Sequence, residues 1–202
     1  MAVVEGVVLA GGPAVEAGFL SSAKQCPSPN CDARPEGATV DLLVIHSISL
    51  PAGQYGGGAI EALFSNRLDA KDYTEFTELV DLRVSAHLLI RRDGELLQFV
   101  NLDQRAWHAG ESCFSGRSRC NDFSIGIELE GTDSDQFSAE QYRVLLAVTD
   151  ALLKHYPALT IDHIVGHEDI APGRKTDPGP GFDWQYYRRQ LRRAALSLKG
   201  GQ

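Results

Sequence analysis

The spacing of apolar and polar positions predicts several short strands in this chain. Residues 41–46 (DLLVIH) form an apolar run rich in branched side chains, which predicts a buried strand with His46 at its C-terminal end. Residues 85–91 and 95–100 are two further runs of this kind, and the Asp-Gly dipeptide between them predicts a hairpin. Residues 160–165 predict another short strand.

The segment FSIGIELE, residues 123–130, alternates between apolar and polar positions. Since successive side chains of a strand point to opposite faces, its isoleucines and leucine are expected to face the core. Glu128 and Glu130 then lie together on the other face. On pattern alone, the ordinary interpretation of Glu128 is a strand carboxylate that faces solvent.

Helical spacing is clearest in the second half of the chain. Residues 138–155 are predicted to form a helix, because Ser138 and Gln141 make a capping box and apolar positions recur until the stop before Pro157. Residues 59–66 also have helical spacing, and a second short helix is predicted around residues 74–80.

The end of the chain combines a long loop with a helix. Residues 168–182 are rich in Gly and Pro, and loops of that length are usually functional or disordered. Asp183 is expected to cap a basic helix that ends near residue 198. Strands mixed with helices, including one adjacent hairpin, predict an α/β fold: a single domain whose mixed central β-sheet is flanked by helices.

Composition fits one globular domain. The chain has 202 residues, with 43% hydrophobic and 23% charged positions, close to the globular average. Residues 26–202 are predicted to form the domain, and residues 1–25 an N-terminal extension.

The charge balance and the hydrophobic runs exclude some classes of partner. There are 19 Lys and Arg against 27 Asp and Glu, and the net charge of -8 argues against nucleic acid. No run approaches the roughly 18 to 20 apolar residues of a membrane span, and no basic residue precedes the apolar start as in a secretory signal. We therefore expect a cytoplasmic protein with neither a membrane nor a nucleic-acid partner.

Four cysteines occur in two pairs, spaced C-x4-C at Cys26 and Cys31 and C-x6-C at Cys113 and Cys120. Neither spacing matches the C-x2-C of zinc knuckles, so free thiols are expected in a reducing compartment. The alternative is a structural zinc held by all four cysteines.

Two histidine arrangements are candidates for a metal site. His163 and His167 have the H-x3-H spacing of helical ligands, but the residues between them favour a strand, on which the two would lie too far apart for one ion. The other arrangement takes His46 and His167 from strand ends and Asp177 from the following loop, because strand ends and loops converge on one edge of a sheet. The alternative is that His167 and Asp177 are ordinary loop and turn residues.

A set of longer motifs goes beyond these patterns. In order they are LLVIHSISLP, VSAHLLIRRDGELLQFV, RAWHAGES, RCNDFSIGIELEGTD and VGHEDIAPGRKTDPGPGFDW. Together they resemble the zinc-dependent N-acetylmuramoyl-L-alanine amidases of the amidase-2, peptidoglycan-recognition-protein-like family, over roughly residues 26–187. Within that family the chain is most similar to cytosolic enzymes that act on 1,6-anhydro muropeptides in cell-wall recycling.

The resemblance implies roles for individual residues. His46, His167 and Asp177 match the ligands of one Zn²⁺ ion, which would leave an open position for water. Glu128 matches the catalytic carboxylate that moves protons between water and the leaving amine. Lys175 matches the catalytic lysine, a cation placed where a tetrahedral oxyanion forms.

Substrate contacts are implied more loosely. Arg83 and Arg119 occupy positions that look like the family's contacts to the carboxylates of the stem peptide, although both could be surface arginines. Trp107 could offer a flat face to a sugar or peptide or pack in the core, and His108 could line the site or be structural. Ser47 departs from the asparagine expected after the zinc histidine.

The expected activity is hydrolysis of the amide between the lactyl group of 1,6-anhydro-N-acetylmuramic acid and L-alanine, with a small muropeptide as the partner of a monomer. Two alternatives come from other classes. One is a recognition module of the same fold that binds muropeptides without cleaving them, although such modules lack a complete metal set. The other is a serine hydrolase, but no G-x-S-x-G motif occurs.

Overall fold

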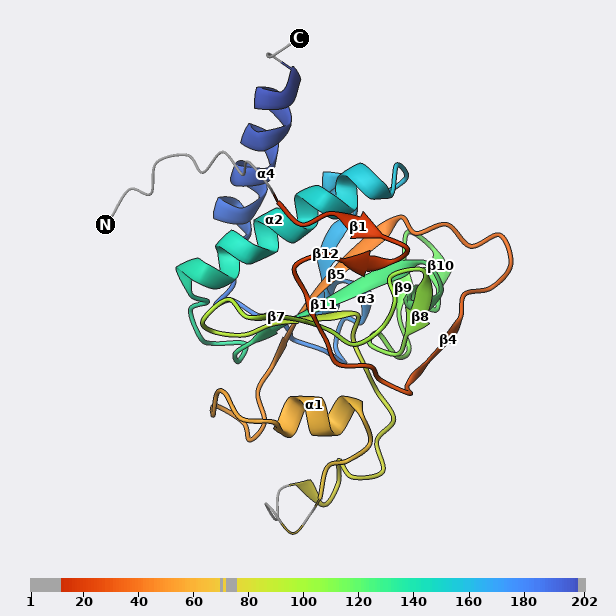
Figure 1. Ribbon diagram of the computed structural model, residues 1–202, viewed down its shortest axis with the longest axis vertical. Helices are drawn as coiled ribbons and strands as arrows, with labels where there is room; N and C mark the ends of the chain where they lie inside the picture. Colours follow the sequence, from red (N-terminus) through yellow and green to blue (C-terminus); the bar gives the residue numbers. More distant parts are fainter. Residues whose placement is uncertain (1–11, 70, 72–75, 200–202) are drawn as a thin grey trace.

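The computed structural model describes residues 12–69, 71 and 76–199 (Figure 1). The strands are β1 (Val15–Glu16), β2 (Phe19–Leu20), β3 (Lys24–Gln25), β4 (Cys31–Ala33), β5 (Leu42–Ile48), β6 (Leu88–Ile90), β7 (Leu96–Gln98), β8 (Gln104–Ala106), β9 (Cys113–Phe114), β10 (Arg117–Ser118), β11 (Ser124–Glu130) and β12 (Ile164–Gly166). The helices are α1 (Ala59–Phe64), α2 (Ala139–His155), α3 (His167–Ile170) and α4 (Trp184–Lys199), with short 3-10 turns η2 (Cys120–Asp122) and η3 (Ile161–His163).

A six-stranded mixed sheet in the order β12-β5-β11-β6-β7-β3 forms the centre of the molecule. β12, β5, β11 and β6 are parallel, whereas β6 and β7 form the predicted antiparallel hairpin. Residues 42–48 of β5 pair with residues 124–130 of β11 over seven positions. All seven residues of β11 are buried, polar positions included, and so are the first five residues of β5, whereas Ser47 and Ile48 are half-buried.

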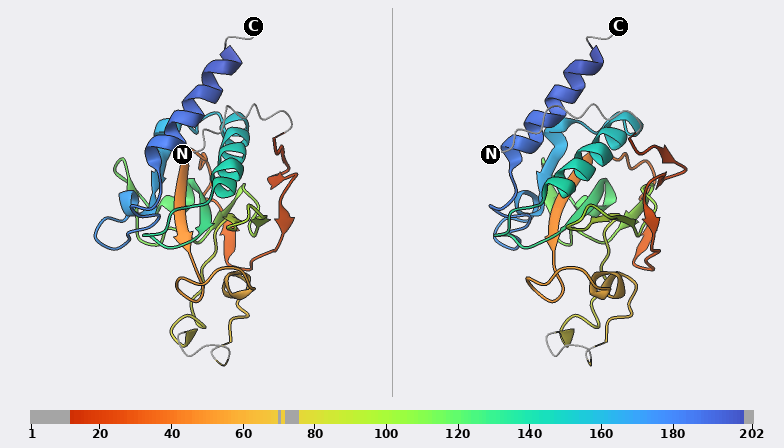
Figure 2. Two further views of the ribbon diagram at one scale, coloured as in Figure 1. Left: turned by 90° about the vertical axis from the view of Figure 1, so that its left-hand side faces the viewer. Right: turned by 60° about the vertical axis from the view of Figure 1, so that its left-hand side comes forward.

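Helices and loops cover the two faces of this sheet, as the views in Figure 2 illustrate. One face packs against α2 and α4 in a cluster that contains Leu43, Ile127 and Leu145. The opposite face has two parts. One packs against α1, in a cluster that contains Phe64 and Leu89. The other packs against α3 and η2, in a cluster that contains Val44, Cys120 and Ile170. The result is a three-layer α/β arrangement, which confirms the predicted fold class.

The two long helices begin where local signals predict. Ser138 caps α2: its hydroxyl accepts from the Gln141 amide at 3.1 Å, and the Gln141 side chain accepts from the Ser138 amide at 3.0 Å. Asp183 accepts from the Tyr186 amide at 2.8 Å and so caps α4. Among the described helices, none offers the long apolar stretch that a bilayer crossing requires.

Two predicted elements differ from the structure. The helix predicted at residues 74–80 falls partly on residues 74 and 75, which lie outside the described residues; residue 76 has 3-10 conformation and residues 77–80 form turns, so these positions are not α-helical. The strand predicted at 160–165 is a 3-10 turn, η3, followed by β12. The predicted loop at 168–182 starts inside a short helix, α3, and is irregular after it up to α4.

The described part of the predicted N-terminal extension is packed onto the domain. β3 pairs with β7 at the edge of the central sheet, and Leu20 is 2% exposed within the core cluster. The Gln98 side chain accepts from the Leu20 amide and donates to the Gly18 carbonyl, both at 2.9 Å. Residues 15–25 therefore contribute to the sheet and to the core.

Candidate metal centre and active site

Strand register brings the candidate residues to one edge of the sheet. In the parallel pair β5–β11, His46 lies directly beside Glu128. In the pair β12–β5, Gly166 lies beside Ile45, and the next residue, His167, begins α3. Three adjacent parallel strands thus carry these side chains to the same end of the sheet, where binding sites of α/β sheets commonly lie.

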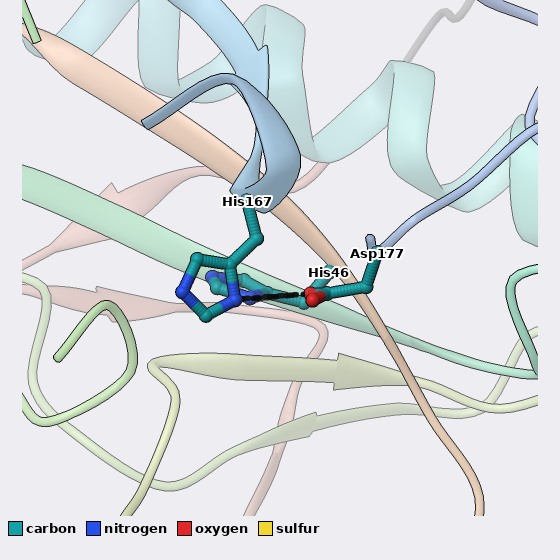
Figure 3. A group of neighbouring side chains, drawn as sticks. All are labelled: His46, His167 and Asp177. Carbon is teal, nitrogen blue, oxygen red and sulfur yellow. Dashed lines mark hydrogen bonds and ion pairs between the residues drawn. The ribbon is translucent and has the colours of Figure 1, made fainter. Parts of the chain in front are cut away.

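His46, His167 and Asp177 converge on a single point (Figure 3). The Nδ1 atoms of the two histidines are 3.0 Å apart, and Oδ2 of Asp177 lies 3.0 Å from Nδ1 of His46 and 3.1 Å from Nδ1 of His167. In the described part of the chain, this is the one group of three or more His, Cys, Asp or Glu side chains close enough to share an ion.

The chemistry of these three atoms fits a divalent metal. Nε2 of His167 lies 3.1 Å from the carbonyl oxygen of Ala109, which can only accept, so Nε2 carries the proton of the neutral ring and Nδ1 presents a lone pair. That lone pair faces a carboxylate oxygen, an arrangement that needs a cation or a proton between them. A tetrahedral ion with bonds of 2.0 to 2.1 Å has ligand separations of about 3.3 Å, close to the triangle observed.

Electrostatics favour the charge states that such ligands need. Burial lowers the pKa of His46 to about 4, despite the opposing effect of Asp177, so its imidazole is neutral at pH 7. Burial alone would raise the pKa of the Asp177 carboxyl, but contact with His167 and His46 outweighs it and holds that pKa well below its usual range. The His46 imidazole is therefore neutral and Asp177 is a carboxylate, the charge states in which both can bind a metal.

Glu128 borders this triangle as a buried and incompletely bonded acid. It is 9% exposed, and its Oε2 has no hydrogen-bond partner among the residues that the structure describes. Burial raises its pKa well above the usual value, the charge of Asp177 raises it further, and Lys175 acts in the opposite direction. The interpretation of Glu128 as a solvent-facing strand carboxylate is wrong, because the polar face of β11 is covered by other parts of the chain.

The loop that carries Asp177 and Lys175 is fixed at several points. The Glu168 amide donates to the Asp177 carbonyl at 2.9 Å. Asp133 accepts from the Thr176 hydroxyl and, at 3.0 Å, from the Ser47 hydroxyl. Lys175 is exposed, and its charge lowers the pKa of both Glu128 and His46. Ser47, the departure from the expected asparagine, thus helps to tie this loop to the end of β5.

The four residues predicted to contact substrate are placed differently from one another. Arg83 is exposed and donates to the Val80 carbonyl at 3.0 Å, and Arg119 is 71% exposed with an ion pair to Asp122 at 3.3 Å. Trp107 is half-buried. His108 is buried, and neither of its ring nitrogens is free: Nδ1 lies 2.9 Å from Nε2 of His46 and Nε2 lies 3.1 Å from the Ser124 hydroxyl.

The other metal arrangements are not supported by the geometry. All four cysteines are free thiols, and no cysteine belongs to a group able to share an ion within the described residues. His163 lies in η3 and its Nδ1 contacts the Asp41 carbonyl at 2.9 Å. Asn121, whose side chain accepts from the His108 and Ala109 amides, and Ala109, whose carbonyl contacts His167, were not identified from sequence, since a side-chain amide in a 3-10 turn and a backbone carbonyl carry no motif.

A comparison with known proteins identifies the family. The family described as N-acetylmuramoyl-L-alanine amidase matches residues 36–180. The chain belongs to this family. Among its relatives, the 1,6-anhydro-N-acetylmuramyl-L-alanine amidase AmpD of Escherichia coli (strain K12) is 55% identical over 174 residues, which are 86% of this chain and 94% of that protein. AmpD of Haemophilus influenzae (strain ATCC 51907 / DSM 11121 / KW20 / Rd) is 50% identical over 173 residues, 86% of this chain and 94% of its own.

Solved structures of N-acetylmuramoyl-L-alanine amidases share this fold. The crystal structure of a selenomethionine derivative of AmpD has a TM-score of 0.85 and 52% identity, covering 88% of this chain and 98% of that one. AmiD from E. coli, in complex with the substrate anhydro-N-acetylmuramic acid-L-Ala-D-gamma-Glu-L-Lys, has a TM-score of 0.55 and 27% identity, covering 95% and 73%. The protein is therefore an amidase that hydrolyses its substrate, rather than a non-cleaving module or a serine hydrolase.

Proposed function

We propose that this amidase hydrolyses the bond between the lactyl group of 1,6-anhydro-N-acetylmuramic acid and L-alanine, with one Zn²⁺ held by His46, His167 and Asp177. The observation that carries the proposal is the triangle of two imidazole nitrogens and one carboxylate oxygen, with sides of 3.0 to 3.1 Å, beside a buried glutamate. The anhydro sugar is supported by the activity named for relatives that are 50 to 55% identical.

The reaction adds water across the amide, so a proton must leave the water and another must reach the departing nitrogen. A zinc ion with two histidines and one carboxylate supplies Lewis acidity and a bound water whose pKa is about 7. Glu128 accepts the proton of the attacking water and returns it to the amine of L-alanine. Its raised pKa suits this exchange, because a carboxyl that holds a proton more firmly is a better base when ionised and can donate near neutral pH.

Lys175 supplies positive charge at the open side of the centre. It is exposed, and its charge acts on both Glu128 and His46, which supports a place at this end of the sheet. We assign it to the carbonyl oxygen, which becomes negative when water adds to the carbonyl carbon. Removal of one such donor costs about 2.7 to 4 kcal/mol in other enzymes.

The metal part of the proposal is tested with three proteins: wild type, Asp177→Ala and Glu128→Gln. Bound metal and cleavage of an anhydro-muropeptide are measured on the same preparations. Asp177→Ala is expected to lose metal and activity together, because one ligand is gone. Glu128→Gln is expected to keep the metal and lose turnover by at least about 100-fold, since the contribution of proton transfer is typically 10²–10⁴-fold. Full activity of a metal-free preparation would refute the mechanism.

The substrate part of the proposal uses matched sugars. The same stem peptide is attached to 1,6-anhydro-N-acetylmuramic acid or to ordinary N-acetylmuramic acid, and kcat/KM is compared. A higher value for the anhydro substrate is expected, and equal values would remove the anhydro preference while leaving the amidase mechanism intact.

We extend the proposal to a monomer that acts in the cytoplasm. The four free cysteines suit a reducing compartment. The large apolar side chains that the structure exposes, Phe19, Tyr55, Leu82 and Leu196, are scattered along the chain, and single exposed apolar residues are normal for a monomer surface. Light scattering of the purified protein gives the oligomeric state directly.

A further inference from the structure

The dipeptide His108–Ala109 contacts both histidines of the candidate metal centre. It does so at their Nε2 atoms, whereas their Nδ1 atoms face Asp177. Nε2 of His46 lies 2.9 Å from Nδ1 of His108, and Nε2 of His167 lies 3.1 Å from the carbonyl oxygen of Ala109. The rings of His46 and His108 meet edge to face, with centroids 5.0 Å apart and an interplanar angle of 88°. His108 and Ala109 are both buried.

These contacts limit which ring nitrogen of each histidine can carry the proton. Nε2 of His167 lies 3.5 Å from the Arg174 guanidinium but nearer, at 3.1 Å, to the Ala109 carbonyl, which can only accept, so the shorter contact places the proton of His167 on Nε2. For His46 the same result requires that Nδ1 of His108 accepts. It can do so when the proton of His108 is on Nε2, where the Ser124 hydroxyl lies 3.1 Å away and is able to accept it.

We propose that His108 is a positioning residue of the metal centre: together with the Ala109 carbonyl it holds His46 and His167 with their protons on Nε2, so that both Nδ1 lone pairs face the ion. The inference rests on the proposed zinc site and deepens it. It replaces the predicted substrate contact of His108, whose two ring nitrogens are both occupied within the protein.

The surroundings hold the dipeptide in place. Asn121 accepts through Oδ1 from the amides of both His108, at 3.1 Å, and Ala109, at 2.8 Å. The ring of His108 lies directly over Gly126 of β11, where an added Cβ would be 2.5 Å from Cγ of His108. Since the ring can neither turn nor shift without breaking these contacts, the acceptor for His46 is fixed before a metal arrives.

The test measures zinc affinity rather than activity. His108→Leu removes the acceptor at similar size, whereas His108→Asn places an amide oxygen near the former Nδ1 position. His163→Leu is the matched control, because it also removes a contact between a ring nitrogen and its neighbour, here the Asp41 carbonyl, but outside the metal centre. Each protein is stripped of metal, and its Kd for Zn²⁺ is measured by competition with a chromophoric chelator.

We expect His108→Leu to weaken zinc binding about 10- to 100-fold, the usual effect of losing an outer partner of a ligand. His108→Asn should recover most of the affinity, and His163→Leu should match wild type. Unchanged zinc affinity in a folded His108→Leu protein would overturn the positioning role, even if activity fell. If wild type itself bound no zinc, the proposed zinc site would be refuted, whatever the variants showed.

A second measurement does not depend on the variants folding. In zinc-loaded wild type with ¹⁵N-labelled histidines, long-range ¹H–¹⁵N spectra report which nitrogen carries each proton. We expect protonated Nε2 in His46, His108 and His167. A proton on Nδ1 of His108 would contradict the inference.

Discussion

Two glutamates on one strand illustrate how environment sets the role of a residue. Glu128 and Glu130 lie on the same face of β11 and are both buried. Glu130 is fully engaged: its carboxylate accepts from Arg91 at 3.0 Å, from the Gly56 amide at 2.7 Å and from the Arg92 amide at 3.1 Å. Glu128 has one oxygen without a partner among the described residues and is buried beside the negative charge of Asp177. The contacts of Glu130 stabilise the fold, whereas the surroundings of Glu128 leave a carboxyl group with a shifted pKa available for proton transfer.

This contrast predicts opposite effects of the same substitution in the metal-free protein. The pKa of Glu128 is higher in the folded than in the unfolded protein. The protonated side chain therefore contributes its full share of the free energy of unfolding below the unfolded pKa, and this contribution is lost as the pH rises through the folded pKa. Glu128→Gln should therefore raise Tm at pH 7 to 8, by roughly 2 to 4 °C for each 1 kcal/mol recovered, and the gain should vanish near pH 4.5.

Glu130→Gln is the matched control, and it should lower Tm because it removes the most deeply buried of the three carboxylates that pair with Arg91. Thermal unfolding with a chelator present, from pH 4 to pH 8, measures both. A lower Tm for Glu128→Gln than for wild type at pH 8 would contradict the conclusion that ionised Glu128 destabilises the metal-free protein.

Elements were predictable where their signals are local. The capping box of α2, the cap of α4 and the Asp-Gly hairpin each depend on residues a few positions apart, and all three form as expected. The alternation in β11 correctly separates the core-facing isoleucines from the polar positions. It could not indicate that the polar face is buried, because the covering groups, His108 over Gly126 and Arg91 beside Glu130, are distant in the sequence.

The close approach of that segment predicts a specific effect at Gly126. Gly126→Ala would place a Cβ 2.5 Å from the His108 ring, so the ring must move and its contact with His46 is disturbed. We expect a stability loss of about 1 to 3 kcal/mol, typical of overpacking, and weaker zinc binding. Gly58→Ala is the control, since its Cβ would meet nothing within 4 Å. Chemical denaturation and chelator competition measure both effects, and a Gly126→Ala protein with wild-type values would exclude tight contact here.

At the scale of the whole molecule, the site depends on strand order that sequence does not reveal. Spacing allowed His46, His167 and Asp177 to converge, but only the order β12-β5-β11 shows which strand ends are neighbours. The motifs that resemble the amidase family supplied what periodicity could not, namely the roles proposed for Glu128 and Lys175. The packing of residues 15–25 could not be predicted either, because no sequence motif indicates that β3 joins the sheet or that Leu20 joins the core.

Leu20 tests whether this N-terminal segment belongs to the folding unit. Its side chain is 2% exposed in the main core cluster, whereas Phe19 is 43% exposed. Leu20→Ala should destabilise the protein by about 2 to 5 kcal/mol, as for other buried leucines, and Phe19→Ala by much less. Urea unfolding of the two variants compares them directly. Equal, small effects would mean that residues 15–25 are an appendage to a domain that is complete without them.

The long sequence separation within the metal centre also has a consequence for the lifetime of the enzyme. Asp177 lies 131 positions after His46, so the three ligands meet only when the entire domain has closed. An ion that binds the folded chain and not the unfolded one raises the free energy of unfolding, and the increase grows with the logarithm of the free ion concentration. On the proposed function, zinc starvation would then do more than stop catalysis: it would expose the metal-free protein to proteolysis, and cellular abundance would follow zinc supply.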